Sequence, residues 1–178
     1  MGSRKTPLKL AVLWHMHQPP YEEPNTGTFL LPWTFLHALK DYRDMGEVIR
    51  RHPRMKVNVN FTPSLLHQIR AYEADVLRDQ TIRVMRKDPA RLVLSEQEFL
   101  LRTCLGINVE LMGAGLPRYR DLAAMYREAS RPGEATARFR PQDYLDLSVL
   151  FLLAWCGPTL SQTEGIRALI ARGRDFSA

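Results

Sequence analysis

An alternating apolar stretch that runs into two prolines is the feature that most constrains how this chain can fold. Side chains over residues 8–14 alternate at the two-residue period of a β-strand, with Leu8, Leu10, Val12 and Trp14 on one face. Pro19 and Pro20 lack an amide donor and fix φ, so the strand must end before them. We therefore expect a strand over residues 9–14 that leads into a stiff loop.

Two histidines follow this expected strand. His15 and His17 are two residues apart, so the period of a strand directs both imidazoles to the same side. Such a pair can bind a divalent metal ion when a carboxylate or a third histidine completes the set, but the nearest acids, Glu22 and Glu23, lie beyond the prolines. The alternatives are hydrogen bonding to a polyhydroxylated ligand, which we favour, and a structural role at the strand end. We expect no metal and no cofactor.

The next segments predict a right-handed parallel βαβ unit. Pro32 suits the first position of a helix, and apolar residues recur at helical spacing from there to Ile49. The chain from Met55 to Phe61 alternates again and places Asn58 and Asn60 on one face. Strand, helix and strand at this spacing form a parallel crossover unit.

After the second strand the sequence predicts helices only. Thr62 is placed to cap a helix that begins at Pro63, and Arg131–Arg140, which contains proline and glycine, is predicted to be an exposed linker. The segment Tyr144 to Trp155 is the most apolar, but a membrane span needs about 20 residues, so a buried core helix is expected. Other helices are expected from the capping box Ser95-Glu96-Gln97-Glu98, from Pro117, from Pro141, and just before Gly173.

Several motifs together resemble one known family. The clearest is His15-Met16-His17-Gln18-Pro19-Pro20-Tyr21 at the end of the first strand. Further similar segments follow in order: Leu31-Pro32-Trp33, His37 to Met45, Asn60 to Leu66 with Gln68 and Tyr72, and more loosely Leu116 to Tyr119 and Asp146 to Trp155. In these motifs the chain resembles glycoside hydrolase family 57, whose members act on α-glucans.

The resemblance implies an α/β fold, the N-terminal β-α-β portion of a (β/α)7-type barrel followed by a mainly helical insertion. Residues 1–78 would supply the barrel portion (βαβα), and residues 79–178 would form the helical region inserted in it or packed on it. A comparable barrel takes about 250 residues. This sequence has 178, so we expect a fragment of a larger domain, predominantly helical by residue count. Its open sheet edge would favour a homo-oligomer or a swapped dimer.

The resemblance also implies a retaining hydrolase or transglycosylase with a glutamate nucleophile and an aspartate acid/base. Neither motif is found in this sequence, so no catalytic residue is assigned and the chain alone is expected to be inactive. Glu110 superficially resembles one motif, but its surroundings are predicted to be helical.

Substrate binding does carry over from the resemblance. Trp33 would stack on a sugar ring, although it equally suits the start of a helix's core stripe. The second function class is a non-catalytic carbohydrate-binding or metal-dependent relative that uses the two histidines as ligands. An α-glucan or maltooligosaccharide is expected to contact His15, His17, Gln18, Tyr21, Trp33 and Asn60.

Composition excludes some partners. The formal net charge is +6, but the basic residues alternate with acids and lack interleaved aromatics, which argues against nucleic acid. Cys104 and Cys156 form no C-x-x-C pair and are expected to be reduced core residues. The first residues contain no apolar signal region, so we expect a cytoplasmic protein that does not enter a membrane.

Overall fold

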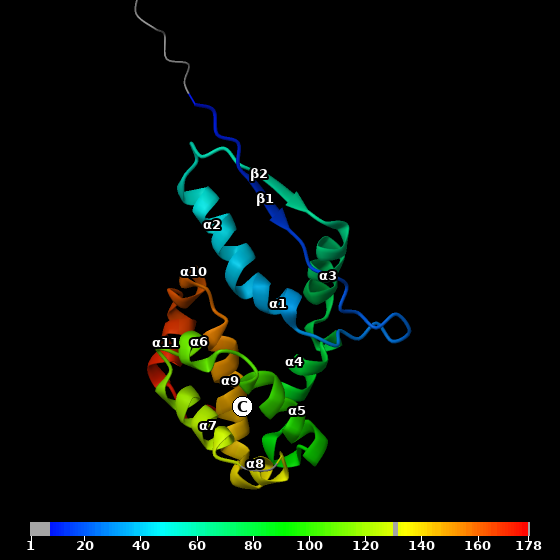
Figure 1. Cartoon of the computed structure of the whole chain (residues 1–178), viewed down its shortest axis with the longest axis vertical. Coiled ribbons are helices and arrows are strands. Elements are labelled where there is room, and N and C mark those ends of the chain that lie inside the picture. The colour runs from blue at the N-terminus through cyan, green and yellow to red at the C-terminus, as the bar shows by residue number, and fades with distance from the viewer. Residues whose placement is uncertain (1–7, 130–131, 178) are drawn as a thin grey trace, which may run out of the picture.

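Two short parallel strands lie beside a larger group of helices in the computed structural model, which describes residues 8–129 and 132–177 (Figure 1). Strand β1 (Leu13–Met16) pairs in parallel with β2 (Asn58–Phe61). The strand order and direction are as predicted, but the expected bounds 9–14 and 55–61 were wrong, because β1 begins four residues later and includes His15. Among the described residues no strand pairs with Leu8 or Leu10, whose side chains are 96% and 85% exposed, so the ladder ends before them.

One helix with a π turn connects the strands. It consists of α1 (Trp33–His37), the π turn η1 (Ala38–Tyr42) and α2 (Arg43–Arg51), and Pro32 precedes it as N-cap. Helix α3 (Pro63–Ala74) follows β2 and contacts α1. In the sheet Met16 is buried whereas Leu13 is exposed, so one face is covered and the other is open.

Helix α9 (Pro141–Ala154) lies at the centre of the helical region and contacts α5, α7 and α11 (Figure 1). Leu147, Leu150 and Phe151 of α9 are fully buried, so the predicted buried core helix is confirmed. The other elements are η2 (Val76–Arg78), α4 (Gln80–Met85), η3 (Pro89–Arg91), α5 (Leu94–Leu105), α6 (Val109–Met112), α7 (Pro117–Arg127), α8 (Pro132–Arg138), α10 (Pro158–Ser161) and α11 (Glu164–Arg172).

The prediction of an exposed linker over Arg131–Arg140 was wrong where the structure describes it, since most of that segment forms α8; Arg131 lies outside the described residues. Ala135 and Phe139 are buried against the core, and Glu134 pairs with Arg138 one turn later at 2.6 Å. Proline and glycine are tolerated in the first turn of a helix, so they did not mark a loop here.

Two capping predictions also needed correction. Thr62 is the N-cap of α3, but its hydroxyl lies 3.2 Å from the Ser64 hydroxyl and caps no amide. Helix α5 begins at Leu94, one residue before the predicted box, and Glu96 accepts a 3.3 Å hydrogen bond from the Val93 amide. In both places the sequence predicted where the helix begins to within a residue, but not which atoms pair with the groups at that end.

A buried ionic network joins α7 to α9. The Arg118 guanidinium contacts Asp143 and lies 3.3 Å from Asp146. Asp146 also accepts a 3.1 Å hydrogen bond from the Phe176 amide, and Gln142 donates to the Phe176 carbonyl at 3.0 Å. The segment after α11 is thereby fixed to the centre of the helical region.

Asp44 ties α2 to α10, since it accepts a 3.0 Å hydrogen bond from the Thr159 amide and another from the Thr159 hydroxyl. It is therefore not simply part of a solvated helix face, as its position in the sequence suggests. In the part of the chain that is described, no helix is both long enough and apolar enough to cross a membrane.

Candidate functional site

The open face of the sheet carries the histidines and the asparagines. His15 lies opposite Asn60 and Leu13 opposite Asn58 in the parallel register. The rings of His15 and His17 are stacked, with centroids 6.1 Å apart and planes inclined by 11°. The prediction that both imidazoles point the same way is confirmed. Both are exposed, so a ligand can reach them from the open side.

The loop after the histidines is held by tyrosines. The Tyr21 hydroxyl donates to Gln18 Oε1 at 2.7 Å, and Gln18 Nε2 donates to the Tyr42 hydroxyl at 3.1 Å. Burial raises the pKa of both phenols, and each is further raised by a neighbour, Tyr42 for Tyr21 and Asp41 for Tyr42. Both tyrosines are therefore neutral hydrogen-bonding groups at physiological pH. The Ser64 hydroxyl completes the support by donating to the Gln18 carbonyl at 2.9 Å.

Gln68 of α3 fixes the same loop from beneath. Its side chain is buried, donates to the carbonyls of Pro19 and Ser64 at 3.0 and 3.2 Å, and accepts from the Tyr21 amide at 3.1 Å. The sequence analysis gave Gln68 no such role. The double proline was the sequence feature that could have indicated this role. A proline contributes a carbonyl acceptor but no amide donor, so its carbonyl needs a donor from elsewhere in the chain.

A second polar cluster lies on the crossover helix next to Tyr42. His37 Nδ1 is 2.5 Å from Asp41 Oδ2, and the His37 ring meets the edge of Trp155 at a centroid distance of 5.5 Å. The His37 and Tyr42 rings are 6.3 Å apart. The π turn brings Asp41 and Tyr42 to this position, and such turns are frequent at functional sites. From the sequence alone, Asp41 is most simply part of the polar face of this helix.

Trp33 shares a neighbour, Trp155, with His37. Its indole packs against Trp155, with centroids 5.9 Å apart, and it begins the apolar stripe of its helix, as the alternative interpretation held. Trp33 also lines a cavity of about 160 Å³ with Phe99 and Arg102. Its stacking on a sugar stays a prediction.

The carboxylates beside the site are paired. Glu22 accepts from His67 at 2.8 Å and from Arg78, and these partners, His67 first, hold its pKa below its usual value. Across the described ranges, no group of three or more histidine, cysteine, aspartate or glutamate side chains is arranged to hold a metal ion.

Glu110 lies far from this chemistry. It belongs to α6, which confirms the predicted helical surroundings, and it forms an exposed ion pair with Arg127 at 3.1 Å. The two cysteines are free, with Cys104 buried and Cys156 partly buried.

The chain is an α/β protein whose polar side chains gather at the carboxyl ends of two parallel strands, the edge where such folds commonly place their sites. Residues 11–172 match glycosyl hydrolase family 57, and the chain belongs to this family. Neither the curated proteins nor the solved structures gave a significant match. Family membership implies glycoside hydrolase or transglycosylase chemistry on glucans.

Proposed function

We propose that this chain supplies the α-glucan-binding edge of a retaining family 57 hydrolase or glucanotransferase. One observation carries the proposal: the stacked pair His15 and His17 and the cross-strand partner Asn60 all project from the open sheet face. Two imidazoles and a carboxamide offer several donors and acceptors within one small area, which suits the hydroxyls of a sugar ring.

Gln18 and Tyr21 contribute by shaping the loop beside the histidines. Both Gln18 side-chain atoms are engaged by tyrosine hydroxyls, so this amide is fixed before any ligand arrives. A fixed polar group loses little conformational entropy on binding, which favours affinity. We assign to Trp33 a stacking contact with a sugar ring further along the bound glucan, at the cavity that Trp33 lines with Phe99.

Cleavage of a glycosidic bond needs carboxyl groups in addition to these binding groups. Retaining glycosidases use two carboxyl groups about 5–5.5 Å apart. The acids on the elements beside the open face, Glu22 and Asp41, are each taken up by a partner, the first by His67 and Arg78 and the second by His37. We infer that this chain binds glucan without cleaving it. The same observation favours a second candidate, a carbohydrate-binding relative that has no catalytic role.

Maltoheptaose tests the proposal. We expect calorimetry to detect binding by the wild-type chain, reduced at least tenfold in His15→Ala and unchanged in His52→Ala, an exposed histidine at the opposite end of the strands. Loss of binding in both variants, or in neither, would contradict the assignment. EDTA should leave binding unchanged, since metal-ligand histidines would make binding sensitive to it. Release of reducing sugar by the chain alone would overturn the inference that it does not cleave.

The sheet also supports the expected association. β1 and β2 form a two-stranded sheet, so each has an outer edge with no partner strand in the described part of the chain. Unpaired parallel edges are normally covered. We propose that two copies pair through these edges, and a monomer by light scattering would exclude it.

A further inference from the structure

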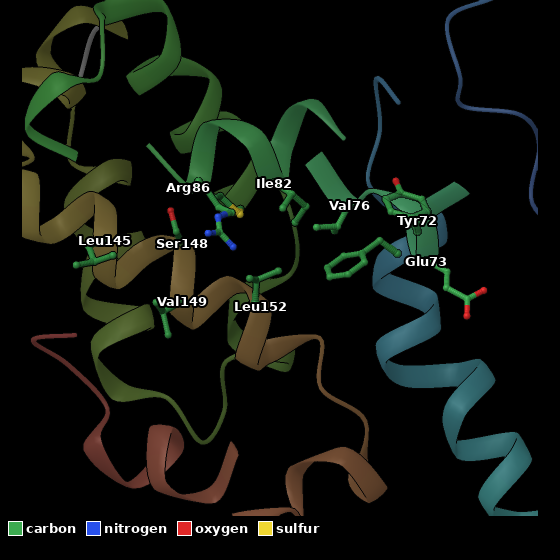
Figure 2. A pocket seen from close by; sticks show the side chains of 11 residues that line it. Tyr72, Glu73, Val76, Ile82, Arg86, Leu145, Ser148, Val149 and Leu152 are labelled. Carbon is green, nitrogen blue, oxygen red and sulfur yellow. The ribbon is translucent and has the colours of Figure 1, made fainter. Parts of the chain in front are cut away.

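A groove of about 620 Å³ lies between the βαβ unit and the helical region (Figure 2). None of the candidate sugar-binding residues lines it. Its walls come from α1, α3, η2, α4 and α9, so it is formed only where the two parts of the fold meet.

One wall is a second apolar stripe on α9. Leu145, Val149 and Leu152 recur at helical spacing and line the groove, and each is only partly buried. On the opposite side of the same helix Leu147 and Leu150 are fully buried in the core. A contiguous exposed apolar surface is a candidate binding site, whereas single exposed apolar residues are ordinary.

The facing wall is also apolar. Phe35, Tyr72, Val76, Ile82 and Met85 complete it. Methionine is flexible and adapts to varied apolar ligands, which suits a site for a chain of methylene groups.

Nearly every polar group that lines the groove is already engaged or turned away. The Tyr72 hydroxyl donates to Asp79 at 2.5 Å, and the Ser148 hydroxyl donates to the Tyr144 carbonyl at 2.9 Å. Figure 2 shows the Glu73 carboxylate directed away from the other lining residues.

Arg86 is the exception. Its side chain lines the groove near the end of α4, and within the described ranges it forms no hydrogen bond or ion pair. A guanidinium prefers a carboxylate, which it can bind through two parallel hydrogen bonds. The groove therefore offers a long apolar surface with one unpaired cation.

We propose that this groove binds an amphipathic carboxylate with a linear apolar chain, a fatty acid, whose carboxylate pairs with Arg86. The volume falls within the range of about 300–1,000 Å³ for small-molecule sites. A protein partner is disfavoured, because the groove is lined by 11 residues whereas stable protein interfaces use about 20–30 on each side. The apolar chain lies along Leu145, Val149 and Leu152.

Decanoate and decanol, used below the micellar concentration of decanoate, test the charge pairing. We expect saturable one-to-one binding of decanoate by calorimetry and at least tenfold weaker binding to Arg86→Gln. Decanol, which lacks the charge, should bind wild type and Arg86→Gln equally. Arg83 of α4 is exposed, as Arg86 is, but it does not line the groove, so Arg83→Gln should bind decanoate like wild type. Absence of decanoate binding, or equal losses in both arginine variants, would refute the proposal.

A filled groove tests the location. Val149→Trp should lose affinity for both decanoate and decanol while it keeps the helical circular dichroism of wild type, and Leu145→Trp replaces it if Val149→Trp unfolds. Binding that survives filling would place the ligand elsewhere and overturn the proposal. Light scattering of the same variant gives one more outcome: a wild-type dimer that filling alone dissociates would identify a second copy as the occupant, in place of the fatty acid.

Discussion

His15 of β1 lies directly opposite Asn60 of β2, so an imidazole and a carboxamide project side by side from the open face of the sheet. Neighbouring residues across a ladder are close enough for one ligand to contact both. The strand register, and not the loop alone, therefore determines which side chains one ligand could contact together.

Asn60→Ala should weaken binding of maltoheptaose about tenfold, because the loss of one hydrogen bond costs about 1.4 kcal/mol. Asn58→Ala is the matched control, since Asn58 lies on the same face but opposite Leu13, one step away from the histidines. Calorimetry on both variants checks the prediction. Equal losses would show that the register does not select the binding residue.

Gln68→Ala should lower the free energy of unfolding by about 1–3 kcal/mol, because it leaves the Tyr21 amide and the Pro19 carbonyl without their partner in the interior. It should also weaken glucan binding, because the loop that carries Gln18 is no longer fixed. Gln162→Ala, at an exposed position, should change stability by less than about 0.5 kcal/mol. Urea unfolding and calorimetry measure the two effects, and a stable Gln68→Ala chain with a normal affinity would exclude this role.

Arg118→Met should be among the most destabilising single substitutions in the helical region. It leaves the buried Asp146 without a cation and Asp143 with only the exposed Arg140, 3.6 Å away, and breaking a buried pair in this way costs about 3–5 kcal/mol. Arg127→Met removes an arginine whose ion pair with Glu110 is exposed, and should cost less than about 1 kcal/mol. The comparison is made by urea unfolding at pH 7, and similar costs for the two variants would argue against a buried ionic network.

The sequence predicted the topology well because periodicity reports directly on burial. The direction shared by His15 and His17, the crossover helix and the buried helix from Pro141 all follow from spacing alone. The α8 helix was missed because its proline and glycine indicate a loop unless the burial of Phe139 is known.

Contacts between distant segments could not be read in the same way. Gln68, Arg118 and Asp44 act through partners 25 to 115 residues away, and no local pattern encodes such pairings. The same reason limits the assignment of Trp33, since its neighbour Trp155 comes from the other end of the chain.

Tyr144→Phe should leave stability at pH 7 unchanged or raise it by about 1 kcal/mol, because the buried Tyr144 hydroxyl has no hydrogen-bond partner among the described residues. Burial raises the pKa of Tyr144 from 10.0 to about 12. Ionisation of this phenol therefore has no effect on stability below pH 10, where it is neutral in both states, and it destabilises the folded state progressively as the pH rises from 10 to about 12. Urea unfolding at pH 7 and pH 11 should show a smaller alkaline loss in Tyr144→Phe than in wild type, with Tyr126→Phe as control. A larger loss in the variant would reverse the sign and contradict the prediction.

The number of residues in the π turn at Ala38–Tyr42 sets the direction in which the side chains of α2 point. A π turn holds one residue more than an α turn, and each residue rotates a helix by about 100°. Deleting a single residue here would restore a regular helix and turn Asp44 away from Thr159 while Trp33 stayed in place. One extra residue in this helix thus positions both the Tyr42 hydroxyl beside Gln18 and the Asp44 anchor of α10, so a change in the length of the turn would disturb both contacts together.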